Sequence, residues 1–526
     1  MPTLYQSLLK YNNSDVKALY FEGNSYTFKQ LLVRVRQAAA YLKDKGIHKG
    51  DVVTTVLPNL PITVYLFYAL DAIGAVQNIV HPLTPAEKIL ETMTETGSRH
   101  AILLETLYGE NRQLFEGSEH TFFFVNPMYD KSPLHRRLFY LKYKRARESE
   151  RIFKADKFRA YPEEHCIEHR DERENSVYLH SGGTTGVPKV IALSDASLNN
   201  LAAKVDGIIE GDVKGRSMLA VLPSFHGFGL GMGIHAPLYN HAASALMMKF
   251  DCKKVVRWIN QNKVNMIIGV PLLYQKLLKD GGFLDARLEN LDYCFIGGDN
   301  VPPSLISEFN DVMRSHRSGA MLLEGYGLTE TVTVCCVNTK AAFKDGSVGR
   351  PLRGIDITVR DSQLRSLPAA VTGEVYVKGD TLMNEYLSDP QATGMTLVDI
   401  DGESCVRTGD LGYLDGDGFL FLKGRMKRVF KISGINVYPS EVEKIATDNE
   451  DIIDAAMEFF EEPKPHTVLF VIKSKNTTKT DAQITEEVTA QLTQRLLKYS
   501  LPSKLVFMET FPKTNVGKTD HKAFRE

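Results

Sequence analysis

The chain has 526 residues, enough for several domains of ordinary size, and a formal net charge of −1 at pH 7. A near-neutral chain offers no overall field for nucleic acid, and 43% hydrophobic with 24% charged residues is typical of a globular protein. The six cysteines form no Cys-x-x-Cys pair, so we expect reduced thiols of a cytoplasmic protein rather than a metal site or disulfide framework.

Helices and strands alternate in the first hundred residues. Apolar residues from Leu31 to Leu42 recur at helical spacing after Thr27, which predicts an amphipathic helix that ends by residue 46. Strands are predicted at 52–57 and 75–80, with a helix up to about residue 73 between them. This order favours a mainly parallel sheet covered by helices on both faces.

Two features of this half bear on membranes. The first residues lack a basic flank and an apolar core, so we expect no signal peptide. The apolar stretch 60–80 contains Asp71, whose charge would be costly inside a bilayer, so a buried helix followed by a buried strand is the better interpretation.

Segment 131–159 is rich in Lys and Arg, with leucines and aromatic residues between them. The commoner interpretation of such a segment is a solvated basic face on a helix that spans two lobes. The alternative is a peripheral contact with an anionic membrane, at the inner membrane face for a cytoplasmic chain.

The stretch 178–190 is an apolar run that opens into a loop with three glycines, two threonines, a serine and Lys189. Glycines allow close backbone approach to an anion, and successive N–H groups can cradle phosphate oxygens. Pro188 and Val190 break the Walker pattern, so the loop is a candidate phosphate cradle of another kind, the alternative being a polar loop without a ligand.

Four later strands are predicted to end in polar loops that are rich in Gly or Pro. They end near residues 222, 270, 296 and 323, and the last leads into Glu324-Gly-Tyr-Gly-Leu-Thr-Glu330. Ligands of open α/β sheets bind outside the carboxyl ends of strands, so these loops should converge on one site.

From about residue 345 short alternating strands indicate a β-rich subdomain, and the last ~85 residues are sufficient for a small α+β domain. We therefore predict an α/β protein with a large N-terminal domain, 1–426, of layered, mainly parallel sheets flanked by helices plus the β-rich subdomain. A small mobile C-terminal domain, 427–526, follows a hinge near Lys427.

These residues fit the joining of a carboxylic acid to ATP. Both reactants are anions, so cations and hydrogen-bond donors must bring them together. Glu330 suits Mg²⁺ shared with phosphate oxygens, Thr329 can donate to the α-phosphate, and Tyr326 offers a ring to adenine. Asp410 and Arg425 suit the ribose, and Lys518 is a cation that could neutralise the carboxylate.

The motifs resemble, in order and spacing, those of the adenylate-forming superfamily, and among its members the AMP-forming acyl-CoA synthetases. The resemblance is carried by segments 181–189, 222–226, 324–331, 347–351, 408–410, 424–443 and 512–518. The chain departs from the pattern at Val190, where glycine is usual, at Glu324, where glutamine is commoner, and at residues 384–386.

The resemblance implies roles for individual residues. His226 would close the acyl pocket, Lys427 would be the hinge, and Lys431 and Gly434 would belong to the face used for thioester formation. Lys518, Thr329, Glu330 and His226 would be catalytic. The cofactor-binding set would be Ser181, Gly182, Gly183, Thr184, Thr185, Gly186, Lys189, Glu324, Gly325, Tyr326, Asp410 and Arg425. ATP, Mg²⁺ and coenzyme A would be used.

The predicted acyl pocket contains His226, Phe228, Gly297, Gly298 and Val334, without lysine or arginine. Such a pocket favours an apolar acid, and we predict a medium- or long-chain fatty acid. Two alternatives remain open. One is a stand-alone adenylation enzyme or a ligase for a phosphopantetheinyl carrier protein, and the other is a catalytically silent relative that binds nucleotide or acyl ligand.

Overall fold

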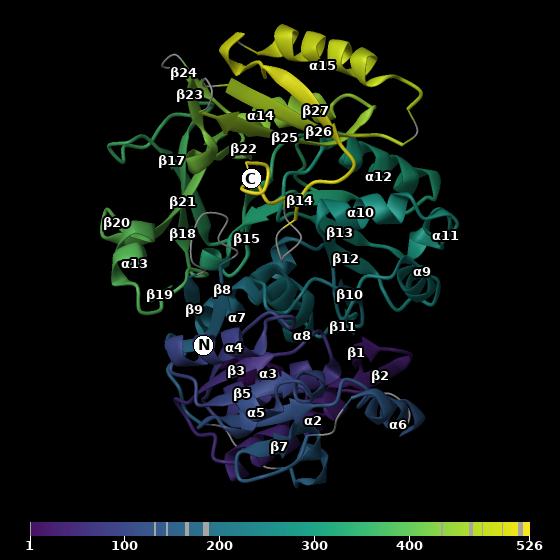
Figure 1. The fold of residues 1–526 in the computed structure, drawn as a ribbon, viewed down its shortest axis with the longest axis vertical. Coiled ribbons are helices and arrows are strands. Elements are labelled where there is room, and N and C mark those ends of the chain that lie inside the picture. Colours follow the sequence, from purple (N-terminus) through teal and green to yellow (C-terminus); the bar gives the residue numbers. More distant parts are fainter. Residues whose placement is uncertain are drawn as a thin grey trace.

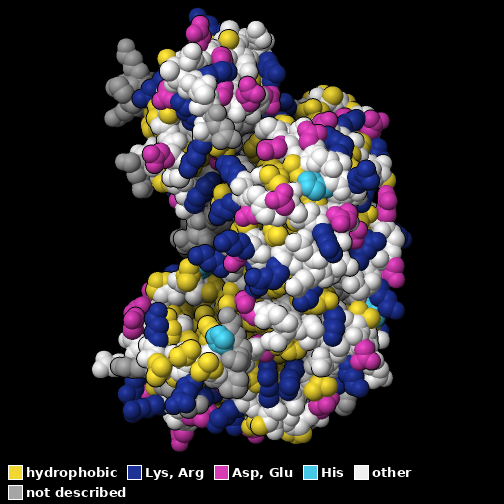
Figure 2. All heavy atoms as spheres, turned by 90° about the vertical axis from the view of Figure 1, so that its right-hand side faces the viewer, with side chains coloured by type: hydrophobic (Ala, Val, Ile, Leu, Met, Phe, Trp, Pro, Cys, Tyr) yellow, Lys and Arg dark blue, Asp and Glu magenta, His cyan; other side chains and the backbone are white. Residues whose placement is uncertain are grey.

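The computed structural model describes residues 2–130, 133–143, 146–163, 168–181, 189–432, 435–461, 466–475, 477–496, 498–513 and 519–525. Two large sheets lie one above the other in the lower and middle parts of the molecule, and the C-terminal residues form the top (Figure 1). Acidic and basic side chains are interspersed over the face in Figure 2.

The first sheet has the strand order β19-β9-β8-β4-β3-β5-β6-β7. Its strands are β3 (Val52–Val56), β4 (Val76–Ile79), β5 (His100–Leu104), β6 (Thr121–Val125), β7 (Ile152–Lys154), β8 (Asn175–His180), β9 (Val190–Ser194) and β19 (Glu385–Tyr386). Its helices are α3 (Pro61–Ala72), α4 (Ala86–Glu95), α5 (Arg112–Glu116) and α6 (Pro133–Lys142). Strands β8 and β9 form an antiparallel hairpin, whereas β3 to β8 pair in parallel.

The second sheet has the order β16-β15-β14-β13-β12-β10-β11-β1-β2. Its strands are β1 (Lys17–Phe21), β2 (Asn24–Thr27), β10 (Ser217–Ala220), β11 (Ala243–Leu246), β12 (Met266–Gly269), β13 (Tyr293–Ile296), β14 (Leu322–Gly327), β15 (Val334–Val337) and β16 (Arg350–Pro351). The helices of this region are α1 (Leu4–Leu8), α2 (Phe28–Asp44), α7 (Asp195–Ala203), α8 (Ala236–Tyr239), α9 (Cys252–Asn260), α10 (Pro271–Leu278), α11 (Gly281–Leu284) and α12 (Pro303–Ser315).

Helices α2 and α3 confirm the predictions for the N-terminal half. Thr27 caps α2 by accepting from the Gln30 N–H, and the buried face of α2 runs from Leu31 to Leu42. Every residue of α3 is buried, so the apolar stretch 60–80 is core between the two sheets. None of the described helices combines the length and apolar character that a bilayer span requires.

The β-rich subdomain is the third sheet, in the order β17-β18-β21-β20 with β22 beside β21. Its elements are β17 (Ile355–Arg360), β18 (Gly373–Gly379), α13 (Pro390–Thr396), β20 (Leu397–Ile400), β21 (Glu403–Leu414) and β22 (Leu420–Arg425). It lies beside the second sheet and below the C-terminal residues (Figure 1).

Residues after Arg425 have a hydrophobic core of their own, which includes Val442, Met457, Leu469 and Val488. The elements are β23 (Phe430–Ile432), β24 (Ile435–Val437), α14 (Pro439–Thr447), β25 (Ile452–Phe460), β26 (His466–Lys473), α15 (Asp481–Arg495) and β27 (Lys504–Met508). Helix α14 lies against α12 of the larger part of the molecule. The predicted α/β architecture is thus confirmed.

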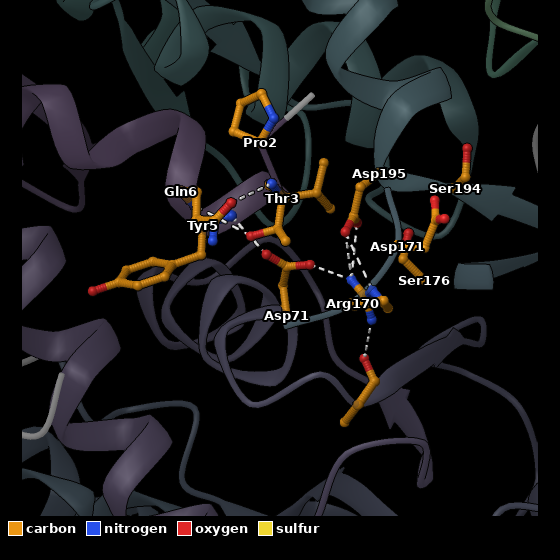
Figure 3. Close-up of polar contacts among 12 residues, drawn as sticks. Pro2, Thr3, Tyr5, Gln6, Asp71, Arg170, Asp171, Ser176, Ser194 and Asp195 are labelled. Carbon is orange, nitrogen blue, oxygen red and sulfur yellow. Dashed lines mark hydrogen bonds and ion pairs between the residues drawn. The ribbon is translucent and has the colours of Figure 1, made fainter. Parts of the chain in front are cut away.

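A buried ion cluster joins the first residues of the chain to the hairpin β8–β9. The Arg170 guanidinium lies between the carboxylates of Asp71 and Asp195, and all three side chains are at most 3% exposed (Figure 3). Asp71 also accepts the Tyr5 N–H at 2.6 Å, close to the Thr3 cap of α1. Burial and the nearby Asp71 charge raise the pKa of Asp195. Removing one partner would leave a buried charge uncompensated.

Two predictions about segment boundaries were wrong. The loop expected from Glu324 begins later, because β14 continues to Gly327 by pairing with β15. Segment 131–159 is not one helix spanning two lobes. Its helix α6 ends at Lys142, and the rest includes β7 and a 3₁₀ turn, Ala155–Ala160.

Candidate active site

A cleft of about 1890 Å³ lies at the carboxyl ends of β10, β12, β13 and β14 and extends to α14. These strands are parallel neighbours, so the predicted convergence of their loops is confirmed. The cleft brings together the predicted residues Ser181, Lys189, His226, Phe228, Gly297, Gly298, Glu324, Gly325, Tyr326, Thr329, Glu330, Val334, Asp410, Arg425 and Lys427.

Glu330 lies in a 3₁₀ turn, Thr329–Thr331, directly after β14. Its Oε1 accepts a hydrogen bond of 2.6 Å from the Tyr386 hydroxyl, and Lys189 Nζ lies 4.5 Å from the centre of the Tyr386 ring. Burial and the Glu330 charge raise the pKa of Tyr386, so its hydroxyl stays protonated and donates.

The Glu330 carboxylate is suited to be a ligand of Mg²⁺. Among the described residues no group of three or more His, Cys, Asp or Glu side chains gathers to form a metal cage. Mg²⁺ commonly binds one or two carboxylates and completes its shell with water and substrate phosphates. Glu330 would hold the ion, and the ion would supply charge neutralisation at the phosphates.

Asp410 lies on β21, opposite Arg425 on β22. Its Oδ2 accepts from the Tyr326 hydroxyl at 2.5 Å, and its Oδ1 is 2.7 Å from Arg425 Nε. The Asp410 N–H is held by the Thr408 hydroxyl at 3.0 Å. A carboxylate held by two side chains, on a backbone that is itself fixed, is a preorganised acceptor for vicinal hydroxyl groups.

His226 is placed beside the Glu330 turn by close backbone packing at Gly227. A Cβ at Gly227 would lie 1.9 Å from the Val332 carbonyl oxygen, so no other residue fits without movement. Val332 has φ 64°, which is a rare conformation for a β-branched residue. Such strain occurs where surrounding structure imposes it, often at functional sites.

Glu324 lies on β14 at the wall of the cleft. Burial raises the pKa of its carboxyl to about 8, an effect that Lys444 of α14 partly opposes. Among the described residues the Glu324 carboxyl has no hydrogen-bond or ion-pair partner. In its protonated form the Glu324 carboxyl offers one donor and one acceptor, as a glutamine amide also can.

Arg428, next to Lys427, is tied to the C-terminal part of the chain. It lies 2.7 Å from Glu443 and 3.7 Å from the buried Glu458. Glu458 in turn binds His521 and Arg525, each at 2.7 Å. Thr519 and His521 line the cleft beside α14.

Some predicted residues lie outside the described part of the chain. They are Gly182, Gly183, Thr184, Thr185, Gly186, Gly434 and Lys518, and the Lys431 side chain is likewise not described. Either side of 182–188, Ser181 and Lys189 are joined by two hydrogen bonds of 2.9 Å, Ser181 N to Lys189 O and Lys189 N to Ser181 Oγ.

Tyr386 was not among the predicted site residues. It comes 56 residues after Glu330, on strand β19 at the edge of the first sheet. Tyr386 could have been suspected as a site residue because it lies in the stretch 384–386, where the chain departs from the family pattern.

The fold is a two-part α/β architecture whose cleft gathers carboxylate, hydroxyl and cationic side chains. The AMP-binding enzyme family model matches residues 10–387, and the chain belongs to this family. It is 28% identical over 522 residues to a long-chain-fatty-acid–CoA ligase of Bacillus subtilis, covering 96% of this chain and 90% of that protein.

Aromatic-acid ligases match as well. The chain is 28% identical to 4-coumarate–CoA ligase 2 of Nicotiana tabacum over 518 residues, covering 95% of this chain and 89% of that protein. The structure of anthranilate CoA ligase AuaEII in complex with anthranoyl-AMP superposes with a TM-score of 0.85 at 20% identity, covering 100% of this chain and 96% of that one. The predicted family, fold and ligase class are confirmed, and the acid substrate is not settled.

Proposed function

We propose that this enzyme activates a medium- or long-chain fatty acid as acyl-AMP, with release of pyrophosphate, and then transfers the acyl group to coenzyme A. The observation that carries the proposal is one cleft with two preorganised carboxylates, Glu330 held by Tyr386, and Asp410 held by Tyr326 and Arg425. One suits a metal–phosphate group and the other a ribose.

The residues divide the first half-reaction among them. An oxygen of the acid attacks the α-phosphorus, a new P–O bond forms, and the bond to pyrophosphate breaks. Lys189 and the loop 181–189 hold the leaving phosphates, and Thr329 donates to the α-phosphate. Glu330 would hold Mg²⁺, which would neutralise phosphate charge. Positioned charges of this kind account for most phosphoryl-transfer catalysis.

The second half-reaction uses the same intermediate. The thiol sulfur of coenzyme A attacks the acyl carbonyl, a C–S bond forms, AMP leaves and the thiol proton passes to solvent. We propose that the domain 427–526 turns about Lys427 to present Lys518 in the first step and the face with Lys431 and Gly434 in the second. Its separate core and the exposed Lys427 support such movement.

The apolar wall of the cleft supports a hydrocarbon substrate. Buried side chains of Met232, Ile268, Phe295 and Val334 line the part near His226, Phe228, Gly297 and Gly298. Burying a second charge against this wall would be costly, which disfavours dicarboxylates and amino acids.

Acid-dependent ATP–pyrophosphate exchange with a panel of acids tests the proposal. We expect saturated acids of eight to sixteen carbons to give a kcat/KM at least ~10-fold above 4-coumarate, benzoate and amino acids. Higher kcat/KM for aromatic acids would refute the fatty-acid assignment. Absence of exchange with every acid would favour the catalytically silent alternative.

The acceptor requires its own measurement. Coenzyme A and a phosphopantetheinyl carrier protein present the same thiol, so both should be offered to enzyme loaded with acyl-AMP. We expect acyl-CoA to form faster; preferential acylation of the carrier protein would identify a carrier-protein ligase.

We also propose that the enzyme meets its acid at the inner face of an anionic membrane. Long-chain acids partition into bilayers, and segment 131–159 supplies basic and apolar residues for such a contact.

A further inference from the structure

Helix α6 presents a stripe of exposed leucines. Leu134, Leu138 and Leu141 are 63%, 52% and 79% exposed, and their spacing of four and three residues places them on one face. Exposed large apolar residues on soluble domains are usually scattered, and a contiguous stripe indicates a contact surface.

The orientation of this helix is fixed by its opposite face. Phe139 is 6% exposed and its ring lies 4.9 Å from that of Tyr143, in a stacked arrangement. The Tyr140 hydroxyl donates to Glu105 at 2.7 Å, and Glu105 also accepts the Ala146 N–H at 2.8 Å. The leucines are therefore exposed while the inner face of α6 is packed.

Positive charge surrounds the stripe. Residues 131–147 contain seven Lys and Arg and no Asp or Glu. Arg137 and Lys142 are exposed, flank the leucines on the helical surface, and form no ion pair with any residue in the described ranges. Figure 2 shows hydrophobic side chains bordered by Lys and Arg on the lower part of this face, the side on which α6 lies in Figure 1.

We infer that the outer face of α6 docks on an anionic lipid bilayer. The three leucines enter the boundary between head groups and acyl chains, and Arg137 and Lys142 contact lipid phosphates. A nucleic acid would pair with the basic side chains but leave the leucines exposed to water. A lipid bilayer can contact both the basic side chains and the leucines. The inference rests on the membrane contact proposed above, specifies the surface that makes it, and is independent of which acid is used.

Co-sedimentation of the full-length protein with vesicles tests this surface. The vesicles contain phosphatidylcholine alone or with about 30% phosphatidylglycerol, at ~100 mM salt. Two variants are compared with the wild type, Leu134→Ser/Leu138→Ser/Leu141→Ser and Arg137→Glu/Lys142→Glu. The matched control is Met395→Ser, since Met395 is 63% exposed on α13, at the opposite side of Figure 1.

We expect binding to the anionic vesicles, a loss of about tenfold or more in partition coefficient in either variant, and no change in the control. Three results would overturn the inference: no binding by the wild type, binding unaffected by the leucine substitutions, or equal loss in the Met395 control. Heparin binding that falls in the charge variant, with vesicle binding unchanged in the leucine variant, would identify a general polyanion site instead.

The vesicle result and the proposed activity are separable. ATP–pyrophosphate exchange with a water-soluble octanoate, measured without vesicles, should be unchanged in both surface variants. Absence of exchange in a wild type that binds vesicles would contradict the proposed reaction and leave the docking surface supported.

Discussion

The hydroxyl of Tyr386 donates to one carboxylate oxygen of Glu330, and no residue of the described ranges bonds the other. Replacing Tyr386 with Phe removes this hydrogen bond and keeps the ring beneath Lys189. We expect the Mg²⁺ concentration for half-maximal pyrophosphate exchange to rise about 10- to 150-fold, since a hydrogen bond to a charged group contributes ~1.5–3 kcal/mol.

A Mg²⁺ titration of the Tyr386→Phe variant checks this expectation. Tyr108→Phe is the matched control, because it removes a 2.8 Å Tyr–Glu hydrogen bond to Glu116 away from the cleft. An unchanged Mg²⁺ dependence, with only kcat reduced, would show that Tyr386 does not position the metal ligand.

Glu324 should give the protein a specific pH dependence. Its folded-state pKa of about 8 lies above the ordinary 4.5, so the folded state retains a proton that the unfolded state loses. The free energy of unfolding therefore falls as pH rises from about 4.5 to about 8. Glu324→Gln removes this loss, and its stability relative to the wild type should grow across that window.

Urea unfolding at pH 5.5 and pH 8.5 measures the difference. The exposed Glu289→Gln serves as control and should show the same difference from wild type at both pH values. If Glu324→Gln gains nothing between the two pH values, the Glu324 carboxyl is already ionised in the folded protein at pH 5.5.

At the scale of elements, the packing of the 3₁₀ turn against Gly227 fixes the distance between His226 and Glu330. In Gly227→Ala the new Cβ would meet the Val332 carbonyl, whose backbone is already strained. We expect a fall of at least ~10-fold in exchange rate and a loss of ~1–3 kcal/mol in stability.

Gly281→Ala is the comparison for this substitution, since no atom lies within 4 Å of a Cβ there. Pyrophosphate-exchange kinetics and thermal unfolding, measured on both variants, test the expected losses in Gly227→Ala. Wild-type activity in Gly227→Ala would mean that the turn can move without disturbing the site.

Secondary structure was predicted well where the cap and the apolar spacing of an element lie within one short stretch of sequence. The Thr27 cap and the leucines of α2 lie within one helix, and the four polar strand ends needed only the general rule for parallel sheets. The extension of β14 could not be predicted, because Gly325 and Tyr326 become strand by pairing with β15, and short-range patterns do not report such pairing.

At the scale of the whole molecule, the proposed turn of domain 427–526 about Lys427 would select the half-reaction that the cleft performs. Lys513 and Thr519 pair across 514–518, and Thr519 lies at the cleft. We expect Lys518→Ala to lower acid-dependent pyrophosphate exchange at least ~100-fold and to leave thioester formation from supplied acyl-AMP within about twofold.

Both half-reactions of Lys518→Ala should be assayed on the same preparation. Equal loss of the two would refute a domain that presents different faces in turn. Lys522→Ala, a nearby exposed lysine, should retain both activities.

Contacts between distant segments account for what the sequence did not predict. Tyr386 meets Glu330, and Arg170 meets Asp71 99 residues earlier, because separate elements pack together. Motif spacing predicted which residues share the cleft, whereas the hydrogen bonds that hold their side chains depend on this packing and have no local signal.

The Arg170 cluster also has a consequence for the order of events during synthesis. Arg170 and Asp195 are synthesised at least 165 residues after Tyr5, and at 5–20 residues per second that is roughly 8–30 seconds. Until then α1 lacks the charge balance at Asp71 that holds it. Helix α1 is thus made well before the residues that hold it, and it reaches its final place only once the hairpin β8–β9 and Asp195 have emerged.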